Sequence, residues 1–437
     1  MTKYVKKAKA FAVEPFVQFL KQESSSSIIM LLAMTSAMIL ANSAYSGWYH
    51  DLWHMEVGIA FGGFSLHKSL IHWINDGLMA IFFLVIGLEI KREILIGELS
   101  SFRKALLPMI AALGGAVVPA LIYAGLNMNG GIMSGWGVPM ATDIAFAIGI
   151  MALLGSRVPI QLKIFITSLA VVDDMIAVIV IALFYTHEII YTYLLYAGIA
   201  VALLAVLNFT KVKSILVYLA VGIFLWYFLL KSGVHATIAG VILAFFIPSE
   251  PRIPLQTYSR TMNTFLKELN DSKNNPDSEI PTKDQKKMFN KIIHASLSVY
   301  NPMSRLEYNL HGISAYFIMP LFAFANTGVT ISSEAFSSLA SPVSLGVIFG
   351  LLIGKPLGIL ASVKIGEKLK MITMPEEISG KLLFGAAVLS GIGLTMSIFI
   401  SGMAFSAAYA DVSKIAILTA SVIAGISGYT ILRIASK

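Results

Sequence analysis

Long apolar stretches separated by short polar ones run along almost the whole chain. About 20 apolar residues suffice to carry a helix across the hydrocarbon core of a bilayer, and this pattern predicts twelve such spans. They are residues 27–44, 71–90, 105–126, 134–155, 164–185, 189–208, 214–230, 233–248, 311–329, 342–363, 382–403 and 415–434. The pattern is typical of an all-α polytopic membrane protein, with residues 1–437 forming a single transmembrane domain.

Two segments between the predicted spans differ from short loops. Residues 57–66 (VGIAFGGFSL) have apolar, strand-like flanks around Gly62–Gly63, and predict either a small external β-hairpin or an ordinary loop. A hairpin of this kind exposes edges that can pair with a second subunit. Residues 249–304 form a polar insertion loop on the cytoplasmic side, in which Leu255–Leu269 and Asp284–Leu297 are expected to be short surface helices.

The basic residues indicate the orientation. The loops after spans two, four, six and ten hold twelve Lys and Arg, whereas the loops after spans one, three, five, seven, nine and eleven hold three. Cytoplasmic loops carry this excess, and an even number of spans returns the chain to its starting side, so both termini are expected in the cytoplasm. The composition, 57% hydrophobic and 13% charged, agrees with a membrane protein. The net charge of +8 therefore reflects membrane orientation and gives no indication of nucleic-acid binding, and zero cysteines exclude thiolate chemistry.

Two spans are predicted to be broken near mid-membrane. Span four contains Pro139, Thr142 and Asp143, and span eleven contains Gly391, Gly393, Thr395 and Ser397. Residues of this kind at mid-depth are typical of interrupted helices that line a cavity, although a kinked and well-packed helix is the alternative. Interruptions at corresponding places in two halves indicate a transporter with inverted-topology repeats, here spans three to five and ten to twelve.

Four charges are predicted to lie inside the membrane: Asp143, Asp173, Asp174 and Lys355. Such residues are costly there and mark ion or proton pathways. Asp143 and Lys355 suit the ends of the broken helices, where partial charges of both signs meet, and Lys355 could equally pair with Asp173. Carboxylate and hydroxyl oxygens suit Na⁺, Li⁺ or protons, and desolvation favours a protonated carboxyl, so H⁺ and Na⁺ would compete for one site.

The chain resembles the NhaA-type Na⁺/H⁺ antiporters over essentially its whole length. The motifs that carry the resemblance include WINDGLMAIFFLVIGLEIKRE (73–93), ATDIAFAIG (141–149), VVDD (171–174), SGVHATIAGV (232–241), PLFAFANTGV (320–329), LIGKPLGI (352–359) and GIGLTMSIFI (391–400). This resemblance implies electrogenic, pH-regulated Na⁺(Li⁺)/H⁺ exchange by alternating access in the bacterial inner membrane, with no enzyme activity and no cofactor. It also implies a homodimer joined through the external hairpin. The 249–304 insertion is longer than the connection that the resemblance implies.

The resemblance also assigns roles to residues at the motif positions. Asp173 and Asp174 are implied to bind the ion and the proton, with Thr142 as a further oxygen ligand of Na⁺ or Li⁺. Asp143 and Lys355 are implied to offset the half-helix charges. Five further residues match positions in a cytoplasmic funnel or linked to the pH response: Glu89, Lys91, Glu93, His235 and Glu307. A packed histidine and an interfacial charge cluster are the simpler interpretations of His235 and of the 89–93 group.

Two other classes also place carboxylates in a membrane. An intramembrane aspartyl protease needs one aspartate on each of two facing helices, whereas Asp173 and Asp174 are adjacent on one. A Na⁺-coupled symporter needs a pocket for an organic substrate, and spans four and eleven show no unpaired Arg or aromatic cluster that would form one.

Overall fold

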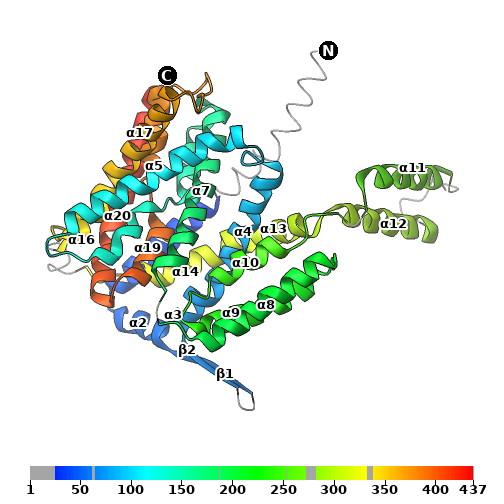
Figure 1. Cartoon of the computed structure of the whole chain (residues 1–437), viewed down its shortest axis with the longest axis horizontal. Helices are drawn as coiled ribbons and strands as arrows, with labels where there is room; N and C mark the ends of the chain where they lie inside the picture. Colours follow the sequence, from blue (N-terminus) through cyan, green and yellow to red (C-terminus); the bar gives the residue numbers. More distant parts are fainter. Residues whose placement is uncertain are drawn as a thin grey trace.

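The computed structural model describes residues 25–61, 64–186, 188–251, 253–271, 282–331 and 338–436. It is built mainly of helices that pack side by side, with a small hairpin at one edge (Figure 1). After a first helix, Ser25–Ala41, the α-helices are α2 Ser46–His54, α3 Leu70–His72, α4 Met79–Ile96, α5 Phe102–Asn127, α6 Ile144–Leu153, α7 Ile160–Phe184, α8 Tyr191–Phe209, α9 Ile215–Ser232, α10 Ile238–Phe246, α11 Leu255–Asp271, α12 Lys283–Val299, α13 Pro302–Ile313, α14 Met319–Asn326, α16 Pro342–Phe349, α17 Lys355–Lys368, α18 Gly380–Leu389, α19 Leu394–Ala404 and α20 Ala407–Ala435.

Seven of the described helices are long and apolar enough to cross a membrane, and the number rises to nine if each of two bent pairs counts as one span. These nine correspond to nine of the twelve predicted spans. In the other three, residues 71–90 and 311–329 are divided by π-helical turns, and residues 233–248 contain only the nine-residue α10. The structure thus supports a multi-pass helical protein, and the count of twelve stays a prediction.

The predicted hairpin is present as a two-stranded antiparallel sheet. Strand β1, Glu56–Phe61, pairs with β2, Phe64–Ser69, in a register that places Glu56 opposite Ser69. The hairpin projects from the lower edge of the molecule in Figure 1, away from the helices that carry the buried charges. Residues 62–63 at its tip lie outside the described residues.

Spans four and eleven are both interrupted. In span four, the 3₁₀ helix η2, Met133–Met140, contains Pro139 and gives way to extended backbone before α6 begins. In span eleven, α18 ends at Leu389 and α19 begins at Leu394, with an angle of 46° between them. The breaks arise because Pro139 supplies no backbone donor and glycines at 391 and 393 do not favour a helix. They leave backbone groups that other parts of the protein must satisfy.

Glycines bring α17 close to α5. A Cβ on Gly358 would lie 2.0 Å from the Gly114 carbonyl oxygen, and one on Gly354 would lie 2.8 Å from the Pro119 Cα. Small residues four apart permit such close packing of membrane helices. Immediately before α17, residues Gly350–Gly354 form the π-helical turn η5. This turn and the close packing fix where Lys355, the first residue of α17, enters the interior.

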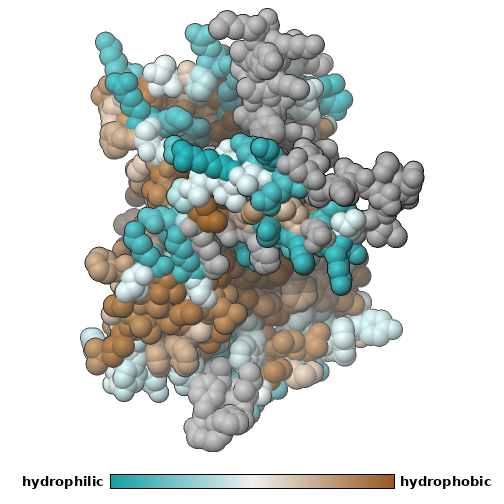
Figure 2. Space-filling view, turned by 90° about the vertical axis from the view of Figure 1, so that its right-hand side faces the viewer, coloured by the Kyte–Doolittle hydropathy of each residue, from teal (hydrophilic) through white to brown (hydrophobic). Residues whose placement is uncertain are grey.

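Helices α11 and α12 form an antiparallel helical hairpin that extends to the right in Figure 1, beyond the other labelled helices. They confirm the two short helices predicted in the insertion. Seen from that side, brown apolar side chains cover much of the lower half of the molecule, and teal polar side chains gather above them (Figure 2).

Candidate functional site

Asp173 and Asp174 lie in the middle of α7, a helix of 25 residues that begins directly after Pro159. Only 3% of Asp173 and 6% of Asp174 is exposed. One oxygen of each carboxylate, Oδ1, has no hydrogen-bond partner among the described residues. Buried carboxylates are stable only with a counter-charge, a proton or a cation, so the surroundings of these two side chains define the site.

The two carboxylates have different surroundings. The Lys355 ammonium, which is fully buried, lies 2.6 Å from Asp173 Oδ2. The Thr142 hydroxyl lies 2.8 Å from the same oxygen. No corresponding cation is placed against Asp174 in the described part of the chain. Asp173 is therefore part of an ion pair, whereas Asp174 is a buried acid with no ion pair to the described residues.

Lys355 and Thr142 also bind the backbone freed by the two interruptions. Lys355 donates to the Met140 carbonyl at the end of η2. The Thr142 hydroxyl lies 2.9 Å from the Ser390 carbonyl, at the end of α18, and its single proton can go to that carbonyl or to Asp173. The ammonium thus lies at the end of η2, where backbone carbonyls carry partial negative charge.

Asp143 meets the opposite, positive helix ends. It is the N-cap residue of α6, and its carboxylate accepts from the Phe146 N–H at 3.3 Å. The other carboxylate oxygen accepts from the Thr395 N–H at 3.1 Å and from the Thr395 hydroxyl at 2.5 Å, in the first turn of α19. One carboxylate therefore caps two helix N-termini, which is where a negative charge is favoured.

A cavity of about 90 Å³ reaches these residues. Its lining includes Asp174, Thr142 and Asp143, together with Glu89 and His311. Asp173 does not line it. The cavity therefore connects the acid that lacks a counter-charge to a second group of charged side chains.

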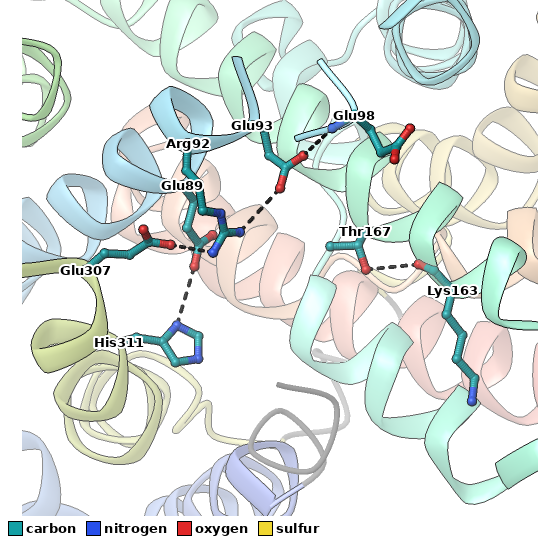
Figure 3. A network of polar contacts seen from close by, with 8 residues as sticks. All are labelled: Glu89, Arg92, Glu93, Glu98, Lys163, Thr167, Glu307 and His311. Carbon is teal, nitrogen blue, oxygen red and sulfur yellow. Dashed lines mark hydrogen bonds and ion pairs between the residues drawn. The ribbon is translucent and has the colours of Figure 1, made fainter. Parts of the chain in front are cut away.

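That second group links α4 to α13 (Figure 3). The Arg92 guanidinium lies 2.6 Å from Glu307 and 3.4 Å from Glu93, and Figure 3 shows it between them. Beside it, Glu89 lies 3.4 Å from the His311 ring. The same view includes Thr167 of α7, whose hydroxyl donates to the Lys163 carbonyl. Glu89, Arg92 and His311 of this group line the cavity, and Glu93 and Glu307 contact Arg92.

Comparison with known proteins identifies the family. The family model described as Na⁺/H⁺ antiporter 1 matches residues 17–432. The chain belongs to this family. A protein of Helicobacter pylori strain G27 named Na(+)/H(+) antiporter NhaA is 48% identical over 423 residues, 96% of this chain and 95% of that protein. A protein of the same name from Oleidesulfovibrio alaskensis is 45% identical, over 96% of this chain and 94% of its own length. One from Saccharophagus degradans, named Na(+)/H(+) antiporter NhaA 1, is 42% identical, over 95% of this chain and 90% of its own length.

Within this member of the family, two predicted funnel residues lie apart from the charged group. Lys91 caps the end of α10, where its ammonium lies 2.7 Å from the Phe245 carbonyl and 2.5 Å from the Ile247 carbonyl. His235 packs edge-on against Phe399 of α19, with ring centroids 5.9 Å apart. Both contacts favour a structural role for these residues.

Glu307 precedes the span predicted at 311–329 and is 7% exposed. Burial raises the pKa of Glu307 to about 7, although the charge of Arg92 opposes that rise. Its carboxyl therefore changes charge near neutral pH.

Arg92 and His311 belong to this charged group but were not predicted as site residues from the sequence. Arg92 stands inside the motif at 73–93, and His311 follows Glu307 by four residues, the spacing that places two side chains on one helix face. That spacing is a signal that could have identified His311.

The different surroundings of the two aspartates predict opposite effects on stability. Asp173→Asn leaves the buried Lys355 ammonium without its counter-charge and should cost roughly 3–5 kcal/mol. Asp174→Asn removes a buried charge that has no counter-charge, and should leave the melting temperature of the purified protein unchanged or raise it. Thermal unfolding of both variants in one detergent checks this. A larger loss of stability in Asp174→Asn would contradict the assignment.

Proposed function

We propose that this chain is a secondary transporter that exports Na⁺, or Li⁺, in exchange for protons across the bacterial inner membrane. The observation that carries the proposal is the pair Asp173 and Asp174, buried beside two interrupted helices, with one carboxylate neutralised by Lys355 and the other lining a cavity. Membership of the Na⁺/H⁺ antiporter 1 family supports it. The cation is cargo, and we expect no cofactor.

The site residues take separate roles in this proposal. A Na⁺ that enters the cavity first meets Asp174, with the Thr142 hydroxyl nearby as a further oxygen ligand. Asp173 joins the coordination when Lys355 moves away from it, because the ammonium and the Na⁺ compete for the same negative charge. Asp143 stays on the two helix N-termini and stabilises them throughout.

Protons drive the exchange by competing for the same groups. A carboxylate must lose its proton before it can bind a cation, so Na⁺ affinity falls as pH falls. If two protons leave for each Na⁺ that binds, one net charge moves per cycle and the exchange is electrogenic. The interrupted helices supply the discontinuity that alternating access requires, and we propose that their two repeats, within twelve spans, move relative to each other.

The charged group around Arg92 is proposed to set the pH response. Glu89 and Arg92 line the cavity that reaches the site, and Glu93 and Glu307 contact Arg92. Lys91 and His235 would act indirectly through α10 and α19. The loop charges support cytoplasmic termini, and with that orientation we propose that this group lies at the cytoplasmic side. The free edges of β1 and β2 support a homodimer that pairs through the external hairpin.

The direct test is exchange by Asp174→Asn in proteoliposomes. The amide keeps the shape of the side chain but loses both its charge and its exchangeable proton, so Na⁺-dependent dissipation of a pH gradient should disappear. Asp411→Asn, which changes an exposed carboxylate on α20, is the matched control and should transport normally. Normal exchange by Asp174→Asn would refute the proposed site.

The dependence of the apparent KM for Na⁺ on pH measures how many protons compete. If one proton competes, the KM should rise about tenfold for each unit by which the pH falls, over the range in which the site is protonated. If two protons compete, the rise should approach about a hundredfold per unit. Arginine keeps its charge in this range, so Lys355→Arg should reduce the steeper slope if Lys355 carries the second proton. A KM that does not vary with pH would rule out competition.

Titration of Glu307 is expected to contribute to the pH dependence of ion exchange. Since the pKa of its carboxyl is about 7, Glu307 is ionised above neutrality and then attracts Arg92 fully. Glu307→Gln resembles the protonated form at every pH, and should move the activation midpoint to higher pH by about one unit. Glu250→Gln, at an exposed position, is the control. An unchanged midpoint in Glu307→Gln would exclude the carboxyl from the response.

A further inference from the structure

Specific side-chain contacts hold α11 and α12 together as a helical hairpin. The Tyr258 hydroxyl lies 2.9 Å from the Ser296 hydroxyl across the two helices. The Lys291 ammonium lies over the Phe265 ring, 5.9 Å from its centroid. The Thr282 side chain and Gln285 form a capping box at the start of α12. The Tyr258–Ser296 and Lys291–Phe265 contacts fix the two helices against each other, so their remaining faces are presented together.

Each helix turns only part of its apolar face toward the other. On α11, Met262 and Phe265 are half-buried, whereas Leu266 is 47% exposed. On α12, Phe289 and Ile293 are 41% and 53% exposed, and their spacing of four places them on one stripe. The hairpin therefore leaves large apolar side chains uncovered outside the helical body of the protein.

The rest of the hairpin surface is basic. The two helices contain six basic and three acidic residues, and all six basic side chains are exposed: Arg260, Lys267, Lys283, Lys286, Lys287 and Lys291. Lys286 precedes Phe289 by three residues and so borders the apolar stripe. Exposed apolar residues flanked by lysines form the surface of a helix that lies in a bilayer interface and binds anionic lipid.

We propose that the α11–α12 hairpin docks on the anionic lipid surface of the cytoplasmic leaflet. Leu266, Phe289 and Ile293 enter the boundary between headgroups and acyl chains, and the lysines contact lipid phosphates. Charge complementarity favours this partner, since the hairpin carries a net positive charge. The connections of the hairpin to the rest of the chain also favour a lipid partner. Since α10 ends at Phe246 and α13 begins at Pro302, short segments keep the hairpin near the bilayer that the protein spans.

The inference rests on the proposed orientation, which places the hairpin on the cytoplasmic side. It is independent of ion exchange at Asp173 and Asp174, because the hairpin shares no residue with that site. The two proposals can therefore fail separately, and the test reads hairpin position instead of transport.

The absence of cysteine from the sequence makes a site-specific test direct. An environment-sensitive fluorophore is attached to full-length protein at Ile293→Cys, on the apolar stripe, or at Thr264→Cys, an exposed position on α11 away from it. Each is reconstituted in nanodiscs of neutral phosphatidylcholine, or with added phosphatidylglycerol. We expect severalfold brighter emission at 293 in the anionic discs, quenched by lipid-attached quenchers and reversed by salt, and little change at 264.

Variants that remove positive charges test whether the lysines cause the change in emission. Lys283→Gln, Lys286→Gln and Lys287→Gln together should abolish the signal at 293, while Lys291 remains on Phe265 to hold the hairpin. The signal at 293 should persist when three exposed lysines elsewhere, Lys364, Lys368 and Lys381, are replaced by Gln. Asp174→Asn should also leave the signal intact. The proposal would be overturned if position 293 were equally exposed to water in both kinds of disc. It would also be overturned if position 293 were equally buried in both and the lysine substitutions had no effect, as when a second copy of the chain covers it.

Discussion

The ion pair between Lys355 and Asp173 is the interaction on which the interior depends. A full positive charge without a partner at this depth would cost several kcal/mol, and Lys355 is completely buried. It is stable because Asp173 supplies the counter-charge and the Met140 carbonyl supplies a further acceptor. That carbonyl is free only because the helix of span four is interrupted. The break in the backbone and the buried pair therefore require each other.

Asp143 solves the complementary problem at the other ends of the broken helices. Two helix N-termini lie at Asp143, and each brings N–H groups that have no partner within their own helix. A single carboxylate accepts from both, through Phe146 and Thr395. A fixed negative charge at the N-termini and a fixed positive charge at a C-terminus cancel the partial charges of the half-helices. Asp174 then lacks such a structural contact with the residues that the structure describes, which is why we propose it as the first ion ligand.

The sequence predicted the parts of this arrangement that depend on local chemistry. Proline and glycine indicated both interruptions, and the isolated charges Asp143 and Lys355 indicated compensation at their ends. The sequence left open whether Lys355 pairs with Asp173, because that choice depends on how α17 packs against α5 and α7. The π-helical turn before Lys355 was not foreseen, since it has no clear sequence signature. Lys91 was grouped with its neighbours in sequence, whereas tertiary packing brings its ammonium to the carbonyls at the end of α10.

Two adjacent carboxylates on one helix would be redundant if both had the same environment, and their difference is what makes exchange possible in the proposed mechanism. If both were paired with cations, Na⁺ would have to displace two ammonium groups and would bind weakly. If neither were, two desolvated charges would repel each other and hold protons too tightly to release them. With Asp173 paired to Lys355 and Asp174 on the cavity, an arriving cation gains one carboxylate without displacing a lysine. Only the second contact costs an ion pair, and Lys355 can repay that cost by releasing its own proton, which couples the bound Na⁺ to a proton leaving the site.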